Sequence, residues 1–210
     1  MNAEYTKKLE NLIKQMLTPL KGVPLNLVIE GISNHKIIPF NKRDSKDAAV
    51  LENLKGAAYA AGKTINKKGI VRARPNEIGN DIEPYVKDAL NKLGYAADVP
   101  FTASGRKKAA GYPDIEFTDE FGRANYLECK TFLRSFYLSP DSKITKDARH
   151  FVMSFEIYAA GKKGRNNVYK SKGWKILSVE NLDVDVKYEF NSDNLRLYSE
   201  GLMLAEGELR

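Results

Sequence analysis

The stretch YPDIEFTDEFGRANYLECK, residues 112–130, reads as two short β-strands joined by a turn. Apolar and aromatic residues recur on both sides of the turn signal DEFGR, which is typical of a hairpin. The expected strands span residues 112–117 and 124–131. Because side chains alternate along a strand, Glu128 and Lys130 point to one face and Cys129 to the other.

A hairpin of suitable register brings the carboxylates of Asp114 and Glu128 close together. Two such groups repel unless a hard cation lies between them, and oxygen ligands of this kind suit Mg²⁺, which also binds phosphate oxygens. The ammonium of Lys130 at the rim orients a water or helps to deprotonate it. These are the parts needed to hydrolyse a phosphodiester. The same residues also fit a surface hairpin with an ordinary Glu–Lys pair. Features elsewhere in the chain are needed to distinguish a metal site from such a hairpin.

Composition favours a soluble globular protein with an anionic partner. The 210 residues are 42% hydrophobic and 29% charged, with a net charge of +7 that suggests a polyanion. No apolar run approaches the ~18–20 residues of a membrane span, so no membrane partner is expected. One cysteine and two histidines exclude a disulfide framework and a Cys/His zinc site. The lone cysteine and the lack of a secretory pattern point to the cytoplasm.

Hydrophobic periodicity gives the order of elements along the chain. It predicts helices at residues 3–20, 45–62, 75–93 and near 144–149, and further strands at residues 25–30, 36–40, 95–101, 149–158 and 174–179. The first helix carries a stripe expected to be buried, Asp44 or Ser45 caps the second, and Gly62 ends it. Basic residues at 63–75 and 161–175 are read as loops. The order from residue 76 onward indicates an α/β domain with a central mixed β-sheet flanked by helices.

On these residues the chain resembles the PD-(D/E)xK nuclease superfamily, and within it the type II restriction endonucleases. The similarity covers residues 76–158. It rests on the acid-bearing helix, the following helix and strand, and the motifs Pro113-Asp114 and Glu128-Cys129-Lys130. The resemblance implies a restriction-endonuclease-like core at residues 76–178 and a mainly helical N-terminal extension at residues 1–62, within one nuclease domain, residues 1–210.

The resemblance also implies the roles of the motif residues. Asp114 and Glu128 would bind Mg²⁺, with Mn²⁺ as a substitute, helped by the backbone carbonyl of Cys129. The Cys129 side chain would only pack. Lys130 would position and activate the attacking water.

An acid on the preceding helix often completes such a site. Glu83 fits the spacing seen in archaeal Holliday-junction resolvases, which the chain also resembles. Glu77 competes with it, although at a helix start it equally serves the helix dipole. Six residues apart on an unbroken helix, the two acids point roughly 120° apart, so only one is expected at the site. Glu116 is read as a supporting or surface acid.

Basic residues outside the motif, together with two asparagines and a tyrosine, are the candidates for contact with double-stranded DNA. Three lie just before Asp114 and six lie in the basic segment 161–175: Arg106, Lys107, Lys108, Lys162, Lys163, Arg165, Asn166, Asn167 and Tyr169. Arginine and asparagine read guanine and adenine edges, whereas lysines contact phosphates. We read the second segment as a loop that inserts into a DNA groove, with a merely solvated loop as an equal alternative.

The leading interpretation is a Mg²⁺-dependent type II restriction endonuclease from the cytoplasm of a bacterium or archaeon. It would cut double-stranded DNA at a short specific sequence as a homodimer, leaving 5′-phosphate and 3′-hydroxyl ends. Two alternatives stay open: a structure-specific nuclease such as a junction resolvase or repair nuclease, and a non-catalytic DNA-binding protein on the same fold.

Overall fold

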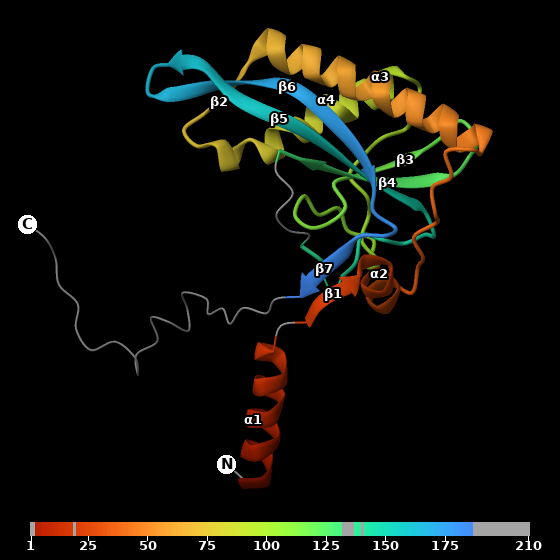
Figure 1. The fold of residues 1–210 in the computed structure, drawn as a ribbon, viewed down its shortest axis with the longest axis vertical. Coiled ribbons are helices and arrows are strands. Elements are labelled where there is room, and N and C mark those ends of the chain that lie inside the picture. The colour runs from red at the N-terminus through yellow and green to blue at the C-terminus, as the bar shows by residue number, and fades with distance from the viewer. Residues whose placement is uncertain (1–2, 19, 132–136, 140, 187–210) are drawn as a thin grey trace, which may run out of the picture. The chain divides into compact units, whose positions relative to one another are not determined.

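The computed structural model describes residues 3–18, 20–131, 137–139 and 141–186 (Figure 1). The helices are α1 (Ala3–Leu17), α2 (Leu25–Ser33), α3 (Ser45–Lys68), the 3-10 helix η1 (Pro75–Glu77) and α4 (Gly79–Lys92). The strands are β1 (Leu20–Pro24), β2 (Ile70–Arg72), β3 (Ile115–Thr118), β4 (Ala124–Lys130), β5 (Arg149–Lys163), β6 (Asn166–Ser178) and β7 (Asp183–Val186). The chain forms two compact units, residues 24–183 and residues 1–23 with 184–210. No helix in the described part is long and apolar enough to cross a membrane.

The smaller unit contains α1 and most of the two-stranded sheet that β1 forms with β7. Apolar residues do recur along α1 at helical spacing, but the expectation that they form a buried stripe is wrong, because Leu9 and Leu12 are exposed. The sheet is tied by the Gly22 amide, which donates to Asp185 Oδ1 at 3.1 Å.

The larger unit is built on a five-stranded sheet in the order β2-β6-β5-β4-β3, in which β4 and β5 run parallel and the other neighbours run antiparallel. The expected mixed α/β architecture is therefore confirmed. Helices α3 and α4 pack together and bury one face of the sheet (Figure 1). Ile115, Leu127 and Phe155 line that face. The core thus holds β3, β4 and α4 in fixed positions, and these are the elements that carry the motif.

Helix α3 begins as expected and ends later than expected. The Asp44 carboxylate caps it by accepting from the amides of Lys46 and Asp47. The helix does not end at Gly62, because Ile65 one turn further is also fully buried and continues the apolar face. It ends at Lys68, and β2 follows directly. Most of the segment 63–75 is therefore regular structure and not a basic loop.

Several other expectations are wrong because a short apolar run does not distinguish strand from helix. Residues 25–30 belong to α2, where Leu25 and Ile29, four apart, are buried and Leu27 is exposed. Residues 36–40 and 95–101 make only isolated bridges. No helix forms at 144–149, where the chain is irregular up to the bridge at Ala148.

Strands β5 and β6 form one long antiparallel hairpin. Pairing runs from Phe151 opposite Ser178 to Lys163 opposite Asn166, and a short turn at residues 164–165 joins the strands. The sequence predicted a loop at residues 161–175, and this prediction is wrong. The segment forms the turn end of the hairpin and most of β6.

Candidate active site

The hairpin of β3 and β4 places Asp114 beside Glu128. Ile115 pairs with Leu127, so the next residue outward on the β3 side is Asp114, opposite Glu128. At this position a side chain takes the place of a backbone acceptor: Asp114 Oδ2 accepts the amide hydrogen of Cys129 at 2.8 Å. The hairpin expected from the sequence is confirmed, and it fixes the Asp114 carboxylate against the backbone of β4.

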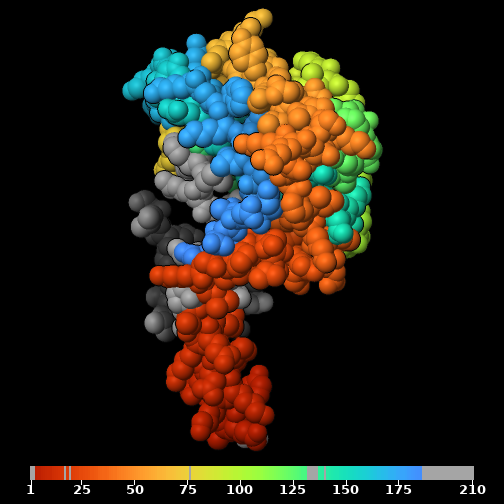
Figure 2. Space-filling model, turned by 45° about the vertical axis from the view of Figure 1, so that its right-hand side comes forward, coloured from red at the N-terminus to blue at the C-terminus, as the bar shows by residue number. Residues whose placement is uncertain are grey.

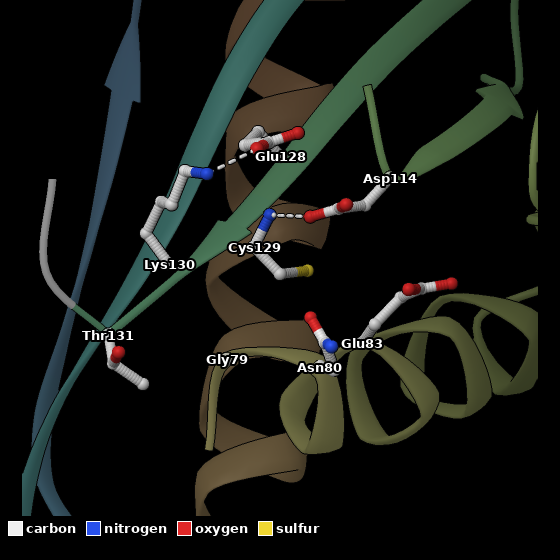
Figure 3. Close-up of a pocket in the computed structure, with 8 residues that line it drawn as sticks. All are labelled: Gly79, Asn80, Glu83, Asp114, Glu128, Cys129, Lys130 and Thr131. Atoms are coloured by element: carbon white, nitrogen blue, oxygen red, sulfur yellow. Dashed lines mark hydrogen bonds and ion pairs between the residues drawn. The ribbon is translucent and has the colours of Figure 1, made fainter. Parts of the chain in front are cut away.

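Glu128 is 4% exposed and forms a contact with the ammonium of Lys130. Lys130 Nζ lies 2.5 Å from Glu128 Oε1, and the two side chains leave the same side of β4, whereas Cys129 leaves the other (Figure 3). The second carboxylate oxygen, Glu128 Oε2, is buried and has no hydrogen-bond partner among the described residues. A buried carboxylate oxygen without a partner is costly, which marks this atom as a position for a ligand.

Burial and mutual repulsion act on the two carboxylates together. Burial, and then the charge of Asp114, raise the pKa of Glu128 to about 7, with Lys130 opposing. Burial also raises the pKa of Asp114, against the hydrogen bond from Cys129 and the charge of Lys130. Below neutral pH the pair therefore tends to hold a proton, and a cation between the carboxylates would displace it.

The residues present fit a hard divalent cation. Two carboxylates converge, one has an unpartnered oxygen, and both are oxygen donors of the kind that Mg²⁺ prefers. No cluster of three or more His, Cys, Asp and Glu side chains suited to a metal occurs among the described residues. A cation here would complete its shell with backbone oxygen and water, which Mg²⁺ commonly does.

A cavity of about 120 Å³ opens between the hairpin and α4 (Figure 3). It is lined by Gly79, Asn80, Glu83, Asp114, Glu128, Cys129, Lys130 and Thr131. Of the two candidate acids on the preceding segment, only Glu83 lines it. Burial and the charge of Asp114 raise the pKa of Glu83. Glu77 lies in η1, is exposed and does not line the cavity.

The thiol of Cys129 faces α4 and belongs to the hydrophobic core. Burial raises the pKa of the thiol well above its ordinary value, and the nearby carboxylates add to the effect. A thiolate is strongly disfavoured there. The placement agrees with the expectation that this side chain packs and does not react.

The family model of the type II restriction enzyme MjaV family matches residues 19–201 of this chain. The chain belongs to the MjaV family of type II restriction enzymes. The type II restriction enzyme MjaV of Methanocaldococcus jannaschii is 36% identical to it over 231 aligned positions, which cover 98% of each chain. No solved structure matches the chain. As an MjaV-family member it is a site-specific deoxyribonuclease of a restriction system, and the matched region contains the whole cavity.

Two of the three basic residues before Asp114 already have acidic partners in this MjaV-family chain. The guanidinium of Arg106 lies 3.4 Å from Asp141, and Lys107 lies 2.5 Å from Asp98. Lys108 is exposed. Glu116, which was expected to be a supporting or surface acid, forms an ion pair with Lys146 and does not line the cavity.

The basic residues of the β5–β6 hairpin differ in exposure. Lys162, Lys163, Arg165 and Asn166 are exposed around the turn. The amide of Asn167 donates to the carbonyl of Ala73 and to the hydroxyl of Tyr169. Tyr169 pairs with Ile70 of β2 and is buried in the core, unlike the exposed residues around the turn.

Sequence reasoning missed one residue near the site, the buried Lys143. Its ammonium is charge-coupled to Asp114, Glu83 and Glu128. A lysine in a polar, irregular segment gives no sequence signal of burial, because lysines are almost always solvated. Only the tertiary structure brings it beside the motif.

Proposed function

We propose that this restriction enzyme hydrolyses double-stranded DNA at a short specific sequence through Asp114, Glu128 and Lys130, with Mg²⁺ as its cofactor and Mn²⁺ as a substitute. The observation that supports this most is the unpartnered oxygen of Glu128, buried beside a second carboxylate and 4% exposed overall. Two neighbouring carboxylates, one with a buried oxygen that has no hydrogen-bond partner among the described residues, offer the oxygen donors that suit a hard cation.

Asp114, Glu128 and the backbone carbonyl of Cys129 would hold the metal. When bound, Mg²⁺ supplies positive charge that offsets the buried pair and the negative charge that develops on the scissile phosphate. Type II restriction enzymes generally need divalent metal ions, which agrees with this assignment.

Lys130 orients the attacking water. An ammonium has three donors and no acceptor, so it positions a water by donating to it and does not remove the proton from it. Its contact with Glu128 Oε1 at 2.5 Å fixes the ammonium at the cavity rim. Glu83, the third acid of the cavity, would hold water on the α4 side. In-line attack at phosphorus then leaves a 5′-phosphate and a 3′-hydroxyl.

The exposed basic residues would form the DNA-binding surface. Lys108 and the β5–β6 turn carry exposed side chains that phosphates can reach. Arg106 and Lys107 would first exchange Asp141 and Asp98 for phosphates. Arg165 and Asn166 next to the turn are the side chains proposed to read base edges.

The remaining features of the proposal concern the whole protein. We assign residues 1–210 to one nuclease domain with a restriction-endonuclease-like core at 76–178, acting in the cytoplasm. A homodimer is proposed because a palindromic target mirrors the two-fold symmetry of a dimer.

The test is digestion of unmethylated phage DNA with the purified protein in Mg²⁺, Mn²⁺, Ca²⁺ or EDTA. Discrete fragments in Mg²⁺ and Mn²⁺ but not in EDTA are expected. Their ends should be ligatable without kinase treatment, because ligases need a 5′-phosphate. Four-way junctions and plain duplexes of the same length serve as comparison substrates.

Three results would contradict parts of the proposal. Cleavage that persists in EDTA would exclude the metal. Ends that need phosphorylation before ligation would exclude the proposed polarity of hydrolysis. Preference for junctions over phage DNA would favour the structure-specific alternative.

A further inference from the structure

Lys143 is a buried lysine beside the site to which the proposed chemistry gives no role. It is 2% exposed, and its Nζ donates to the backbone carbonyls of Ala109 at 3.2 Å, Gly111 at 2.7 Å and Pro113 at 3.1 Å. An ammonium has three N–H donors, so these bonds use its full capacity. Taking an ammonium out of water costs several kcal/mol, which makes an incidental placement a costly one.

The three carbonyls belong to the segment that leads into β3. Pro113 immediately precedes Asp114, and the other two lie within five residues of it. Three backbone carbonyls of this segment are therefore held by one nitrogen atom, Lys143 Nζ. The carboxylate of Asp114, which follows the last of them, accepts from the Cys129 amide on β4. The segment is thus fixed on one side by Lys143 and on the other by β4.

The charge of Lys143 acts on every acid of the cavity. Its ammonium lowers the pKa of Asp114, Glu128 and Glu83, opposing the effect of burial on each. Lys130 acts on the same pair from the cavity rim. Lys130 at the cavity rim and the buried Lys143 therefore both favour the ionised forms of Asp114 and Glu128.

We propose that Lys143 is a positioning residue for cleavage: its ammonium clamps the carbonyls of Ala109, Gly111 and Pro113, so that Asp114 stays directed at Glu128 and β4. This inference rests on the proposed function, in which Asp114 acts at the site. Lys143 itself touches neither substrate nor metal.

The test compares Lys143→Met with the wild type in single-turnover digestion of phage DNA, with the enzyme in excess. Methionine keeps the length and apolar body of the side chain but removes the donors and the charge. The cleavage rate constant is expected to fall by about 100-fold, the usual effect of a misplaced catalytic group. The Kd for a duplex containing the cut site, measured in Ca²⁺, should stay within about threefold, because only transition-state stabilisation is lost.

Hydrogen exchange measured by mass spectrometry gives a readout independent of activity. Peptides covering residues 105–114 should exchange faster in Lys143→Met, and peptides from α3 should not change. Lys92→Met is the matched control, because Lys92 is exposed and pairs with the exposed Asp88 on α4. It should cut and exchange like the wild type. If Lys143→Met does not fold, Lys143→Gln, which keeps two N–H donors, replaces it with the same expected split.

A folded Lys143→Met variant that cuts at the wild-type rate would overturn the inference. So would a loss in which Kd rises as much as the rate falls, because that is the signature of general structural damage. Asp114→Asn in the same assay separates the two proposals. If Asp114→Asn still cuts, the proposed site itself is wrong. If Asp114→Asn is inactive and Lys143→Met is fully active, only the role of Lys143 fails.

Discussion

At the scale of single residues, the site is a place where the fold holds two carboxylates against their repulsion. Burial and Asp114 raise the pKa of Glu128 to about 7. Because this value lies above the ordinary one, the fold favours the protonated form. The corresponding stability is fully present below the ordinary pKa of a glutamate, near 4.5, and is lost as the pH rises through about 7. The site therefore costs the metal-free protein stability at pH values above about 7.

Glu128→Gln should consequently raise the melting temperature at pH 8 in EDTA. The amide removes the buried charge that Asp114 repels, and each 1 kcal/mol of relief corresponds to about 2–4 °C in a chain of this size. The gain should shrink at pH 5, where the wild-type carboxyl is already protonated. Calorimetry at both pH values measures this, and Glu52→Gln, at an exposed pair with Lys55, is the control. A variant less stable than the wild type at both pH values would show that the Lys130 contact outweighs the repulsion.

Lys130→Ala should reduce the cleavage rate constant by about 100- to 1,000-fold, the usual cost of removing a group that stabilises the transition state. DNA binding in Ca²⁺ should be nearly unchanged, because Lys130 lies at the catalytic cavity and away from the proposed binding turn. Single-turnover rates and filter binding separate the two effects. Retained cleavage in this variant would remove Lys130 from the mechanism.

Most of the site, although not all of it, follows from the order of residues. Strand alternation in a hairpin predicts that Glu128 and Lys130 share a side and that Cys129 faces the core. The choice of Glu83 over Glu77 depended on how α4 packs, which the local sequence leaves undecided. Lys143 gave no signal, because the three carbonyls that bind it come from a segment about 30 residues earlier.

At the scale of elements, the junction of α3 with β2 depends on one glycine. Gly69 has φ 71° and ψ 147°, a backbone conformation nearly restricted to glycine. A Cβ on Gly69 would lie 2.6 Å from Val168 Cγ1 on β6. The turn therefore depends on both the backbone freedom and the small size of this residue.

Gly69→Ala should destabilise the protein by about 2–4 kcal/mol, the sum of backbone strain and a steric clash. Gly94→Ala is the matched control. Gly94 also has a positive φ, 90°, but no atom lies within 4 Å of an added Cβ, so only the backbone term applies. Urea unfolding of both variants gives the difference. Equal losses would show that Val168 moves aside at no cost.

The β5–β6 turn makes a separate prediction about salt. If Lys162 and Lys163 contact phosphates, replacing both with alanine should lower the slope of log Kd against log salt concentration by about 1.8, that is, 0.9 for each contact. The double variant Lys55→Ala and Lys92→Ala removes the same charge elsewhere and should leave the slope unchanged. An unchanged slope in the variant that lacks Lys162 and Lys163 would show that these lysines do not contact phosphates.

The sequence failed to predict those elements whose secondary structure depends on contacts with residues far away in the chain. In residues 25–30 either strand or helix periodicity places Leu25 and Ile29 on one face, and only the exposure of Leu27 shows which one applies. Lysine and glycine in the β5–β6 turn region are poor strand formers, yet pairing along the whole hairpin keeps them extended. The Asp44 cap and the β3–β4 hairpin were predictable because their signals lie within a few residues.

At the scale of the whole molecule, the chain combines a net charge of +7 with a cavity whose side-chain carboxylates come from α4, from the residue before β3 and from β4. In the space-filling view the cyan and blue atoms of the β5–β6 hairpin form part of the surface of the larger unit, at the upper left (Figure 2). Positive charge attracts DNA from any direction, whereas the cation that we propose would bind at one point, between the acids. Family membership makes the protein a site-specific deoxyribonuclease, and the cavity is where we place its chemistry.

The most direct measurement is digestion of unmethylated phage DNA in Mg²⁺ by the wild type, by Asp114→Asn and by Asp88→Asn. The asparagine at position 114 keeps the shape of the side chain and removes the charge that a metal needs, whereas Asp88 is an exposed acid paired with Lys92. The account predicts the same discrete fragments from the wild type and Asp88→Asn, and uncut DNA from a folded Asp114→Asn. Discrete fragments from Asp114→Asn at the wild-type rate would contradict it.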